Sequence, residues 1–265
     1  MNTIIRTFLG ITLIAMCSCN SKPKKAATDT PEKKEVAREE TQPSKAEQLV
    51  ADAIKAHGGE LYDIAHYEFM FRDKRYTFKN SKNRSRYTVS SIENTHKIHD
   101  VLENGKLTRT VNGKVVNLSK KDDDKYTEAL NSVIYFATLP HKLKDKAVNK
   151  TYEGRATIKG QDYELVHVNF DHENGGTDYD DKFLYWINTD IKTIDYLAYS
   201  YSTDNGGVRF RCAINPRTVS GIRFQDYINY EVPIGTPLKD LSGIYEKGAL
   251  KELSQIINEE IRELN

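Results

Sequence analysis

Apolar and polar residues alternate through much of this chain, which is the period of a β-strand. In residues 66–78, HYEFMFRDKRYTF, the rings of Tyr67, Phe69 and Phe71 fall on one side of an extended chain. Such runs predict strands at 64–72, 74–80, 84–92, 95–103, 106–111 and 114–118, and again at 152–159, 162–170, 182–188, 192–201, 207–214 and 218–232. The pairs Asn104–Gly105 and Asn112–Gly113 predict two-residue hairpin turns between neighbouring strands.

Three other segments have the 3.6-residue period of an amphipathic helix. The first begins at Ser44, whose spacing from Glu47 fits a capping box, and it ends at Gly58–Gly59. The second covers about 120–138; Ser119, with Asp122 three residues on, resembles its cap, and its end is apolar nearly all round. The third is predicted over 247–264, where leucine and isoleucine recur every three or four residues. Because helices do not alternate with strands, the order disfavours parallel βαβ folds.

Several strands carry apolar residues on both faces. In residues 182–188, KFLYWIN, the side chains of Phe183, Tyr185 and Ile187 point one way, and those of Leu184 and Trp186 point the other. Three helices are too few to cover both faces of so many strands, whereas a sheet that curves onto itself can do so. We therefore predict an α+β fold, in which a curved antiparallel sheet forms a half barrel of about eleven strands with N-terminal, mid-chain and C-terminal helices.

The N-terminal residues have the layout of a bacterial lipoprotein signal peptide. An apolar run from Phe8 to Met16 is far shorter than the roughly 20 residues that span a bilayer, and cysteines follow it at once. Cys19 is the favoured lipidation site, because Ser18 before it suits cleavage, and Cys17 is the second choice.

The chain then divides into three predicted parts. Residues 1–19 are the signal peptide and lipidation site, and residues 20–43, which contain almost no large apolar side chain, form a disordered tether. Residues 44–265 form a single β-rich domain. The predicted location is the cell envelope, with a lipid anchor in the outer membrane of a Gram-negative bacterium.

Charge and composition limit the classes of molecule that this protein is expected to bind. The chain has 39 Lys and Arg against 38 Asp and Glu, so no excess of positive charge predicts nucleic-acid binding. Membrane attachment would depend on the lipid, and no pattern indicates an oligomeric state. Tyrosine is the commonest aromatic, with 16 residues. Its apolar body and polar tip suit a partly wet cavity wall, and they suit cross-strand packing equally well.

Motifs for catalysis or metal binding are weak. The sequence has no P-loop, no GxGxxG and no complete GxSxG. In THKIHD, His96 and Asp100 share a strand face but His99 does not, which disfavours a metal site. We therefore predict no metal, no cofactor and no catalytic residue, and an enzyme of unknown reaction is only the third hypothesis.

Four motifs, HYEFMFRDKRYTF, NSVIYFATLPHKL, DYLAYSY and GGVRFRCAINPR, resemble those of a family of Gram-negative lipoproteins with no established reaction. This resemblance covers nearly all of residues 45–232. The order of elements, with AIKAHGG before the aromatic strands, also resembles the lipoprotein-carrier superfamily of LolA and LolB. That resemblance implies an incomplete antiparallel barrel whose hollow binds acyl chains, and anchoring favours the LolB type. It extends to architecture and matches no specific carrier motif.

The favoured function is non-covalent binding of a lipid or other small hydrophobic ligand in the half barrel. The predicted ligand-binding residues are Tyr67, Phe69, Phe71, Tyr135, Phe136, Leu139, Tyr185 and Tyr199, with Arg72, Arg209 and Arg211 for a head group. The arginines could instead pair with Asp180, Asp181 or Glu231. The second hypothesis is a protein-interaction or scaffold lipoprotein with a filled core.

Overall fold

Fourteen strands form two antiparallel sheets of seven strands each in the computed structural model, which describes residues 42–81, 84–171, 180–203 and 205–265. The predicted signal peptide, the candidate lipidation sites Cys17 and Cys19, and nearly all of the predicted tether lie outside the described residues. The α+β class and the open antiparallel arrangement agree with the prediction. The predicted single sheet of about eleven strands is corrected to two sheets that are not closed.

The first sheet has the strand order β14-β1-β2-β3-β4-β5-β6, and the second has the order β13-β12-β11-β10-β9-β8-β7. In the first sheet the bounds are β14 Glu259–Glu263, β1 His66–Phe71, β2 Lys74–Ser81, β3 Arg84–Glu93, β4 His96–Glu103, β5 Lys106–Val111 and β6 Lys114–Val116. In the second they are β13 Lys251–Ile256, β12 Ile222–Val232, β11 Gly207–Val219, β10 Ile194–Tyr201, β9 Lys182–Asn188, β8 Gln161–Phe170 and β7 Val148–Ile158.

The helices are α1 (Lys45–His57), α2 (Lys120–Ala137) and the short α3 (Leu241–Glu246). The described residues also form the 3₁₀ helices η1 Gly59–Ile64, η2 His141–Lys144 and η4 Leu238–Asp240. Both predicted caps are present, because the Oγ of Ser44 accepts from the backbone N–H of Glu47 and the Oγ of Ser119 accepts from that of Asp122. The first two helices therefore begin where the sequence predicts them.

The predicted C-terminal helix over 247–264 is wrong, because this segment forms β13 and β14. The leucines and isoleucines that suggested a helical stripe are not buried together, and Leu253 is 45% exposed. Each strand instead pairs with a sheet edge, β13 with β12 and β14 with β1. Backbone hydrogen bonding to two available edges outweighs the local helical pattern, since propensity is a weak prior beside tertiary context.

The bend between β13 and β14 is fixed by a buried carboxylate. Asp226 on β12 accepts from the backbone N–H of Asn258 at 2.9 Å and pairs with Arg217 at 3.0 Å. Arg217 also donates to the carbonyl of Asn258. The chain therefore leaves one sheet and enters the other at a defined point, and the two sheets become neighbours along these edges.

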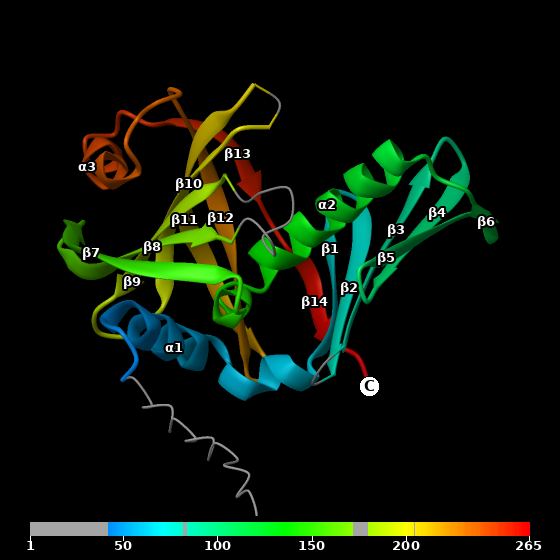
Figure 1. Cartoon of the computed structure of the whole chain (residues 1–265), viewed down its shortest axis with the longest axis horizontal. Coiled ribbons are helices and arrows are strands. Elements are labelled where there is room, and N and C mark those ends of the chain that lie inside the picture. Colours follow the sequence, from blue (N-terminus) through cyan, green and yellow to red (C-terminus); the bar gives the residue numbers. More distant parts are fainter. Residues whose placement is uncertain (1–41, 82–83, 172–179, 204) are drawn as a thin grey trace, which may run out of the picture. The chain divides into compact units, whose positions relative to one another are not determined.

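The opposite edges, β6 and β7, stay apart, and the chain crosses between them through α2 (Figure 1). In this view α2 runs across the space between the two sheets, while α1 lies below the second sheet. Because no strand pairs with both β6 and β7, the sheets cannot close into a barrel. The helix covers the side that the strands leave open.

Both faces of the second sheet are covered, as the strand pattern predicts. Phe183, Tyr185 and Ile187 pack with α1 in one cluster, whereas Leu184 and Trp186 belong to another on the opposite face. The segment that contains α3 covers that opposite face through residues such as Leu241, Ile244 and Tyr245. Two-sided cover of this sheet thus comes from α1 and from the segment around α3.

The first sheet packs its aromatic face against α2 and against the turn end of the β11–β12 hairpin. Tyr67, Phe69 and Phe78 are at most 2% exposed and lie in one cluster with Ile134 of α2 and Phe224 of β12. The hydroxyl of Tyr67 donates to the backbone at the hairpin turn. The row of rings on β1 is therefore the filled core between the two sheets.

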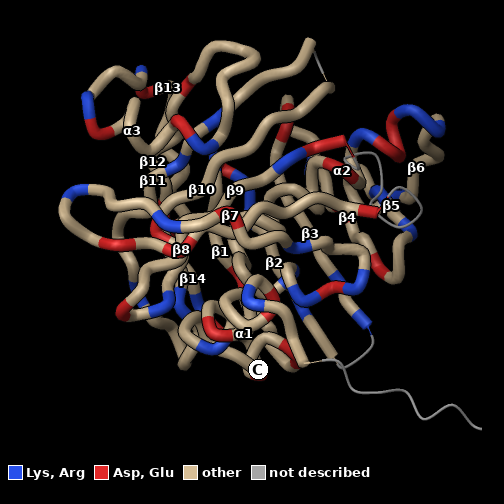
Figure 2. The backbone as a smooth tube through the Cα atoms, turned by 60° about the vertical axis from the view of Figure 1, so that its left-hand side comes forward, with Lys and Arg blue, Asp and Glu red and all other residues tan. Residues whose placement is uncertain are grey.

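Charged residues are distributed evenly, and Figure 2 shows Lys and Arg interspersed with Asp and Glu along the backbone. One network holds α1 to the second sheet: Glu164 on β8 pairs with Lys45 at 3.1 Å and with Arg155 at 2.7 Å. Although burial acts to raise it, these hydrogen bonds lower the pKa of Glu164 to about 2. Glu164 thus remains ionised and keeps both partners at neutral pH.

The first prediction concerns the bend between β13 and β14. Replacing Asp226 by Ala leaves Arg217 and the backbone N–H of Asn258 without their acceptor, and we expect the free energy of unfolding to fall by about 3 kcal/mol. Chemical denaturation measures this loss. The control is Glu231→Ala, which removes an exposed pair with Lys251 between β12 and β13 and should cost at most about 1 kcal/mol. Equal losses in the two variants would contradict the anchoring role of Asp226.

The second prediction concerns His57, whose Nε2 accepts from the backbone N–H of Ile194 at 3.2 Å. Burial lowers the pKa of His57 from 6.5 to about 3, so the folded protein keeps it neutral where the unfolded chain protonates it. Stability is therefore full above pH 6.5 and falls on acidification, by about 2–3 kcal/mol at pH 4.5. His57→Gln keeps an acceptor and cannot titrate, so its stability should change less between pH 7.5 and 4.5. Denaturation curves that lose the same stability in both proteins would rule this out.

Candidate ligand-binding pocket

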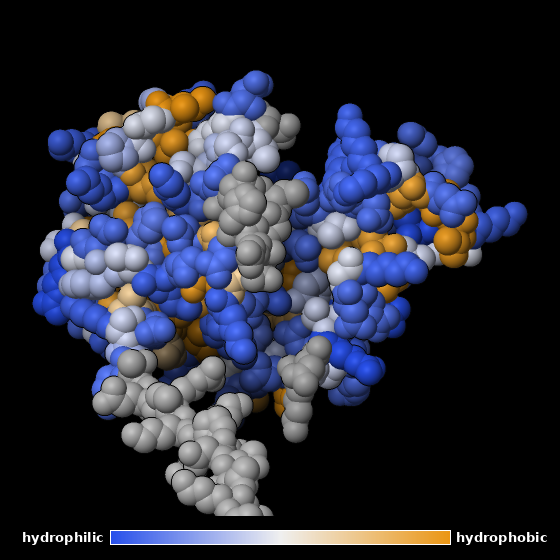
Figure 3. Space-filling model, viewed as in Figure 1, coloured by the Kyte–Doolittle hydropathy of each residue, from blue (hydrophilic) through white to orange (hydrophobic). Residues whose placement is uncertain are grey.

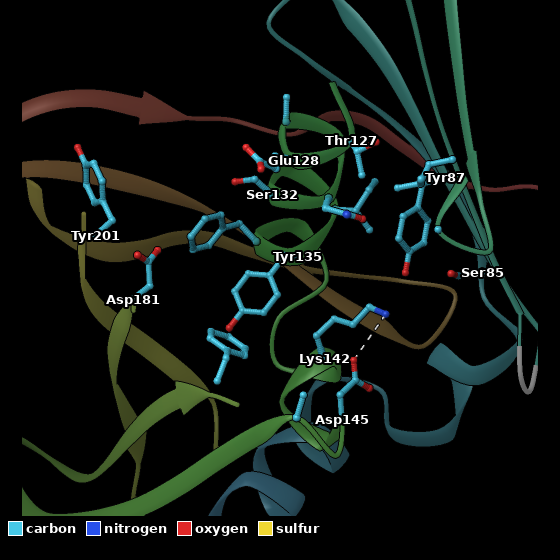
Figure 4. Close-up of a pocket in the computed structure, with 18 of the residues that line it drawn as sticks. Ser85, Tyr87, Thr127, Glu128, Ser132, Tyr135, Lys142, Asp145, Asp181 and Tyr201 are labelled. Atoms are coloured by element: carbon cyan, nitrogen blue, oxygen red, sulfur yellow. Dashed lines mark ion pairs between the residues drawn. The ribbon is translucent and has the colours of Figure 1, made fainter. Parts of the chain in front are cut away.

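A pocket of about 890 Å³ follows α2 and reaches both sheets. On one side it is lined by the β3–β4 region of the first sheet, and on the other by β8, β9, β10 and β11 of the second. Figure 4 shows Tyr87 and Ser85 on one side of α2 and Tyr201 and Asp181 on the other. The space-filling view shows a mostly hydrophilic face with apolar side chains visible in the hollow between the two sheets (Figure 3).

Helix α2 is held at both ends. Near its start, the ring of Tyr126 lies 3.3 Å from the guanidinium of Arg109, which is fixed by two hydrogen bonds to the buried Asp100. After its end, His141 stacks on Tyr62 with ring centroids 4.8 Å apart. The helix therefore has a fixed position over the hollow.

Only Leu130 and Ile134 of α2 are fully buried, and both pack on the first sheet. Tyr135 and Phe136 project on another side, are partly exposed and line the pocket. A helix with large aromatic side chains that are not fully buried leaves apolar area available to another molecule. This property separates α2 from α1, whose apolar stripe is buried against the second sheet.

The second sheet supplies the aromatic wall that faces these two residues. Phe183 stacks on Tyr199 with centroids 5.4 Å apart, Phe136 lies 5.5 Å from Tyr199, and Tyr135 lies 6.0 Å from Phe183. The hydroxyls of Tyr135 and Tyr185 share a 2.7 Å hydrogen bond. Burial raises the pKa of Tyr135, so both hydroxyls stay neutral. The wall is apolar and uncharged.

Arg211 is the buried cation of this pocket, with 7% of its surface exposed. Its guanidinium lies 3.9 Å from the ring centroid of Phe136 and 5.0 Å from that of Tyr199. One nitrogen donates to the hydroxyl of Tyr199 at 2.7 Å, while Nε and Nη1 have no hydrogen-bond partner among the described residues. A guanidinium has five N–H groups, so most of its donors are unused within the described residues.

The remaining charged residues of the pocket lie along α2, on its connection to β7 and immediately before β9. Lys142 forms an ion pair with Asp145 at 3.8 Å (Figure 4). Its ammonium group also lies 5.7 Å from the ring centroid of Tyr87. Asp124, Glu128 and Asp181 also line the pocket. The pocket thus combines an aromatic wall with a charged rim, an arrangement that suits an amphipathic molecule.

Four of the residues predicted to bind ligand line this pocket: Tyr135, Phe136, Tyr199 and Arg211. Tyr185 lies directly behind them, because its hydroxyl bonds to Tyr135 while its ring is fully buried. The structure brings these five together from α2, β9, β10 and β11.

The other predicted residues lie elsewhere. Tyr67 and Phe69 are in the filled core of the first sheet with Phe71 packed beside them, and Leu139 is buried near α1. Arg72 is exposed in the β1–β2 turn and lies over Phe71 at 5.0 Å, and Arg209 lies over Tyr201 at 5.4 Å. None of these six residues is part of the pocket lining in the described chain.

The sequence-based prediction omitted Tyr87, Phe170, Phe183 and Tyr201, which line the pocket. Strand alternation could have identified two of them, because Phe183 shares a face with Tyr185 and Tyr201 shares one with Tyr199. Tyr87 within β3 and Phe170 at the end of β8 carry no such signal, since only the fold brings these strands to α2.

The described part of the chain is thus an α+β protein, in which two joined antiparallel sheets and a crossing helix surround an aromatic pocket. The chain belongs to a family of unknown function, DUF6503, whose model matches residues 41–258. Membership of a family without an established function, which the motifs predicted, is confirmed. A comparison with proteins of curated function finds no match.

Several solved structures have a similar chain path. A LolA superfamily protein from Nitrosomonas europaea is 11% identical, with a TM-score of 0.49, over 84% of this chain and 95% of its own. A putative outer membrane lipoprotein-sorting protein domain from Vibrio parahaemolyticus is 9% identical, with a TM-score of 0.40, over 76% and 99%. A DUF1329 family protein from Desulfovibrio piger is 9% identical, with a TM-score of 0.39, over 83% and 94%. At this level of similarity these proteins carry no information about a ligand.

Two further observations concern the described residues alone. No helix among them has the length and apolar character required to cross a membrane. Within the same residues, no three His, Cys, Asp or Glu side chains are grouped closely enough to hold a metal ion. His99 shares a hydrogen bond with Ser90, and Asp100 is paired with Arg109.

Proposed function

We propose that this protein is a membrane-anchored envelope lipoprotein that binds a lipid or other amphipathic molecule non-covalently in the pocket beside α2. The observation that carries the proposal is the aromatic wall of Tyr135, Phe136, Phe183 and Tyr199, whose packed rings line one side of an open pocket of about 890 Å³. Ligand pockets of proteins commonly have volumes of roughly 300–1,000 Å³ and largely apolar walls.

The position of α2 supports this proposal. The helix is anchored at Tyr126 and at His141, and between these points it leaves Tyr135 and Phe136 facing the second sheet. An apolar chain that enters there would bury aromatic area on both the helix and the sheet, and burial gains about 25 cal/mol per Å². Because the pocket is open on one side, the polar head group of such a ligand would lie near the charged residues at its rim.

The anchoring part of the proposal is drawn from the sequence. Residues 1–19 would act as the signal peptide, with Cys19 as the favoured lipidated residue and Cys17 as the second choice, and residues 20–43 would act as a tether. The domain over 44–265 would then face its ligand from the surface of the outer membrane. An anchored protein of this kind would accept or hold a ligand and would not diffuse with it.

The third prediction tests for the ligand. Full-length protein purified from its membranes in mild detergent should carry a co-purifying lipid, detected by native mass spectrometry. Ser132 on α2 is exposed and lines the pocket on the side of Tyr201 (Figure 4). Ser132→Trp fills part of the space without disturbing the core, so the bound fraction should fall several-fold.

The matched control is Lys121→Trp, which places the same side chain at an exposed position of α2 outside the pocket lining. Its lipid content should equal that of the wild type. Wild-type protein that carries no bound molecule would contradict the proposal and favour a scaffold role. Equal occupancy in the Ser132→Trp variant would show that any bound lipid lies elsewhere.

A further inference from the structure

The guanidinium of Arg211 is a positive charge that the described chain does not neutralise. Only 7% of the surface of Arg211 is exposed. No Asp or Glu among the described residues lies within 4 Å of its guanidinium nitrogens. Of the partners that the sequence offered, Glu231 pairs with Lys251, and Asp181 lines the same pocket without an ion pair to Arg211. A buried charge without a counter-ion is costly, so the fold keeps Arg211 here against a free-energy penalty.

Neighbouring polar groups do not satisfy this side chain. Tyr199 accepts one hydrogen bond from it, at 2.7 Å. Asn229 lies opposite Arg211 on β12, but its Nδ2 donates to Ser254, and its Oδ1 accepts no hydrogen bond from the guanidinium. Nε and one terminal nitrogen therefore have no acceptor among the described residues.

The rings of Phe136 and Tyr199 hold the guanidinium in place, at 3.9 and 5.0 Å from their centroids. These contacts fix the orientation of the fork before any ligand arrives, which lowers the entropy lost on binding. They also line the pocket together with Arg211. The same rings that would contact a hydrocarbon chain thus position the cation that would meet its head group.

From this arrangement we infer that Arg211 receives an oxyanion, a carboxylate or a phosphate, at the head of an amphipathic ligand whose hydrocarbon part lies along Phe136, Tyr199 and Phe183. Two parallel N–H groups of a guanidinium match the two oxygens of either anion. The inference rests on the proposed function and adds the chemical class of the ligand. It assigns this role to Arg211 and not to Arg209, which lies over Tyr201 outside the pocket and donates to the carbonyl of Val208.

The test compares three probes with one tail and different heads: dodecanoate, dodecyl phosphate and dodecanol. Thermal shifts of the full-length protein, measured in one detergent over a range of probe concentrations, give an apparent affinity for each. We expect Arg211→Gln to weaken the binding of at least one of the two anionic probes by about tenfold or more, since hydrogen bonds to charged groups are worth about 1.5–3 kcal/mol. Binding of dodecanol should not change, and the anion that is affected identifies the head group.

Two control variants distinguish a loss of anion binding from a folding defect. Arg209→Gln removes a cation from the same strand face and should leave all three affinities unchanged. Arg211→Lys keeps the charge but loses the planar fork, so it should bind the preferred anion with intermediate affinity. If Arg211→Gln does not fold, the comparison of wild type with Arg211→Lys still decides the matter, and equal anion affinity in these two overturns the inference.

The remaining outcomes separate this inference from the proposed function. If Arg211→Gln leaves every anionic affinity unchanged while dodecanol and the anions bind the wild type, the pocket takes amphipathic ligands and Arg211 has no part in selecting them. If acetate or inorganic phosphate alone binds as tightly as the probe with the same head, the site takes small anions and the hydrocarbon part of the inference is wrong. If no probe binds the wild type, the proposed function fails together with the inference.

Discussion

The crossing of the last two strands from one sheet to the other is the constraint on which the rest of this structure depends. β13 completes the second sheet, β14 completes the first, and Asp226 fixes the bend between them. Once these edges are joined, β6 and β7 remain as the distant edges, and the chain between them must cross the open side. Helix α2 makes that crossing, so the position of the pocket follows from the way the C-terminal residues pair.

The core of the first sheet and the pocket both contain many aromatic side chains, but only the core is completely filled by them. Along the first sheet, Tyr67, Phe69 and Phe78 interlock with Ile134 and leave no room for another molecule. Along the second sheet, the rings of Tyr135 and Phe136 contact those of Phe183 and Tyr199, and together they line an open pocket. The difference arises because Leu130 and Ile134 bring α2 close to the first sheet, and because the helix lacks an equivalent fully buried contact with the second.

Much of this fold could be predicted from local patterns. Twelve of the fourteen strands, the caps of α1 and α2, and the two-sided cover of β9 follow from alternation, capping residues and turn signals. The C-terminal strands could not be predicted, because Leu250, Leu253 and Ile257 have helical spacing and only the sheet edges reveal their strand pairing. Arg211 could be named from its strand face, whereas the filled core around Tyr67 and Phe69 depends on how the hairpin end at Phe224 packs.

A crystal structure of the full-length protein, purified from membranes without removal of lipid, tests most directly whether the space beside α2 is a ligand site. The physical account predicts elongated density in the pocket along the rings of Phe136, Tyr199 and Phe183, ending at the guanidinium of Arg211. A pocket that holds only solvent beside these rings, or that is closed by side chains, would contradict it.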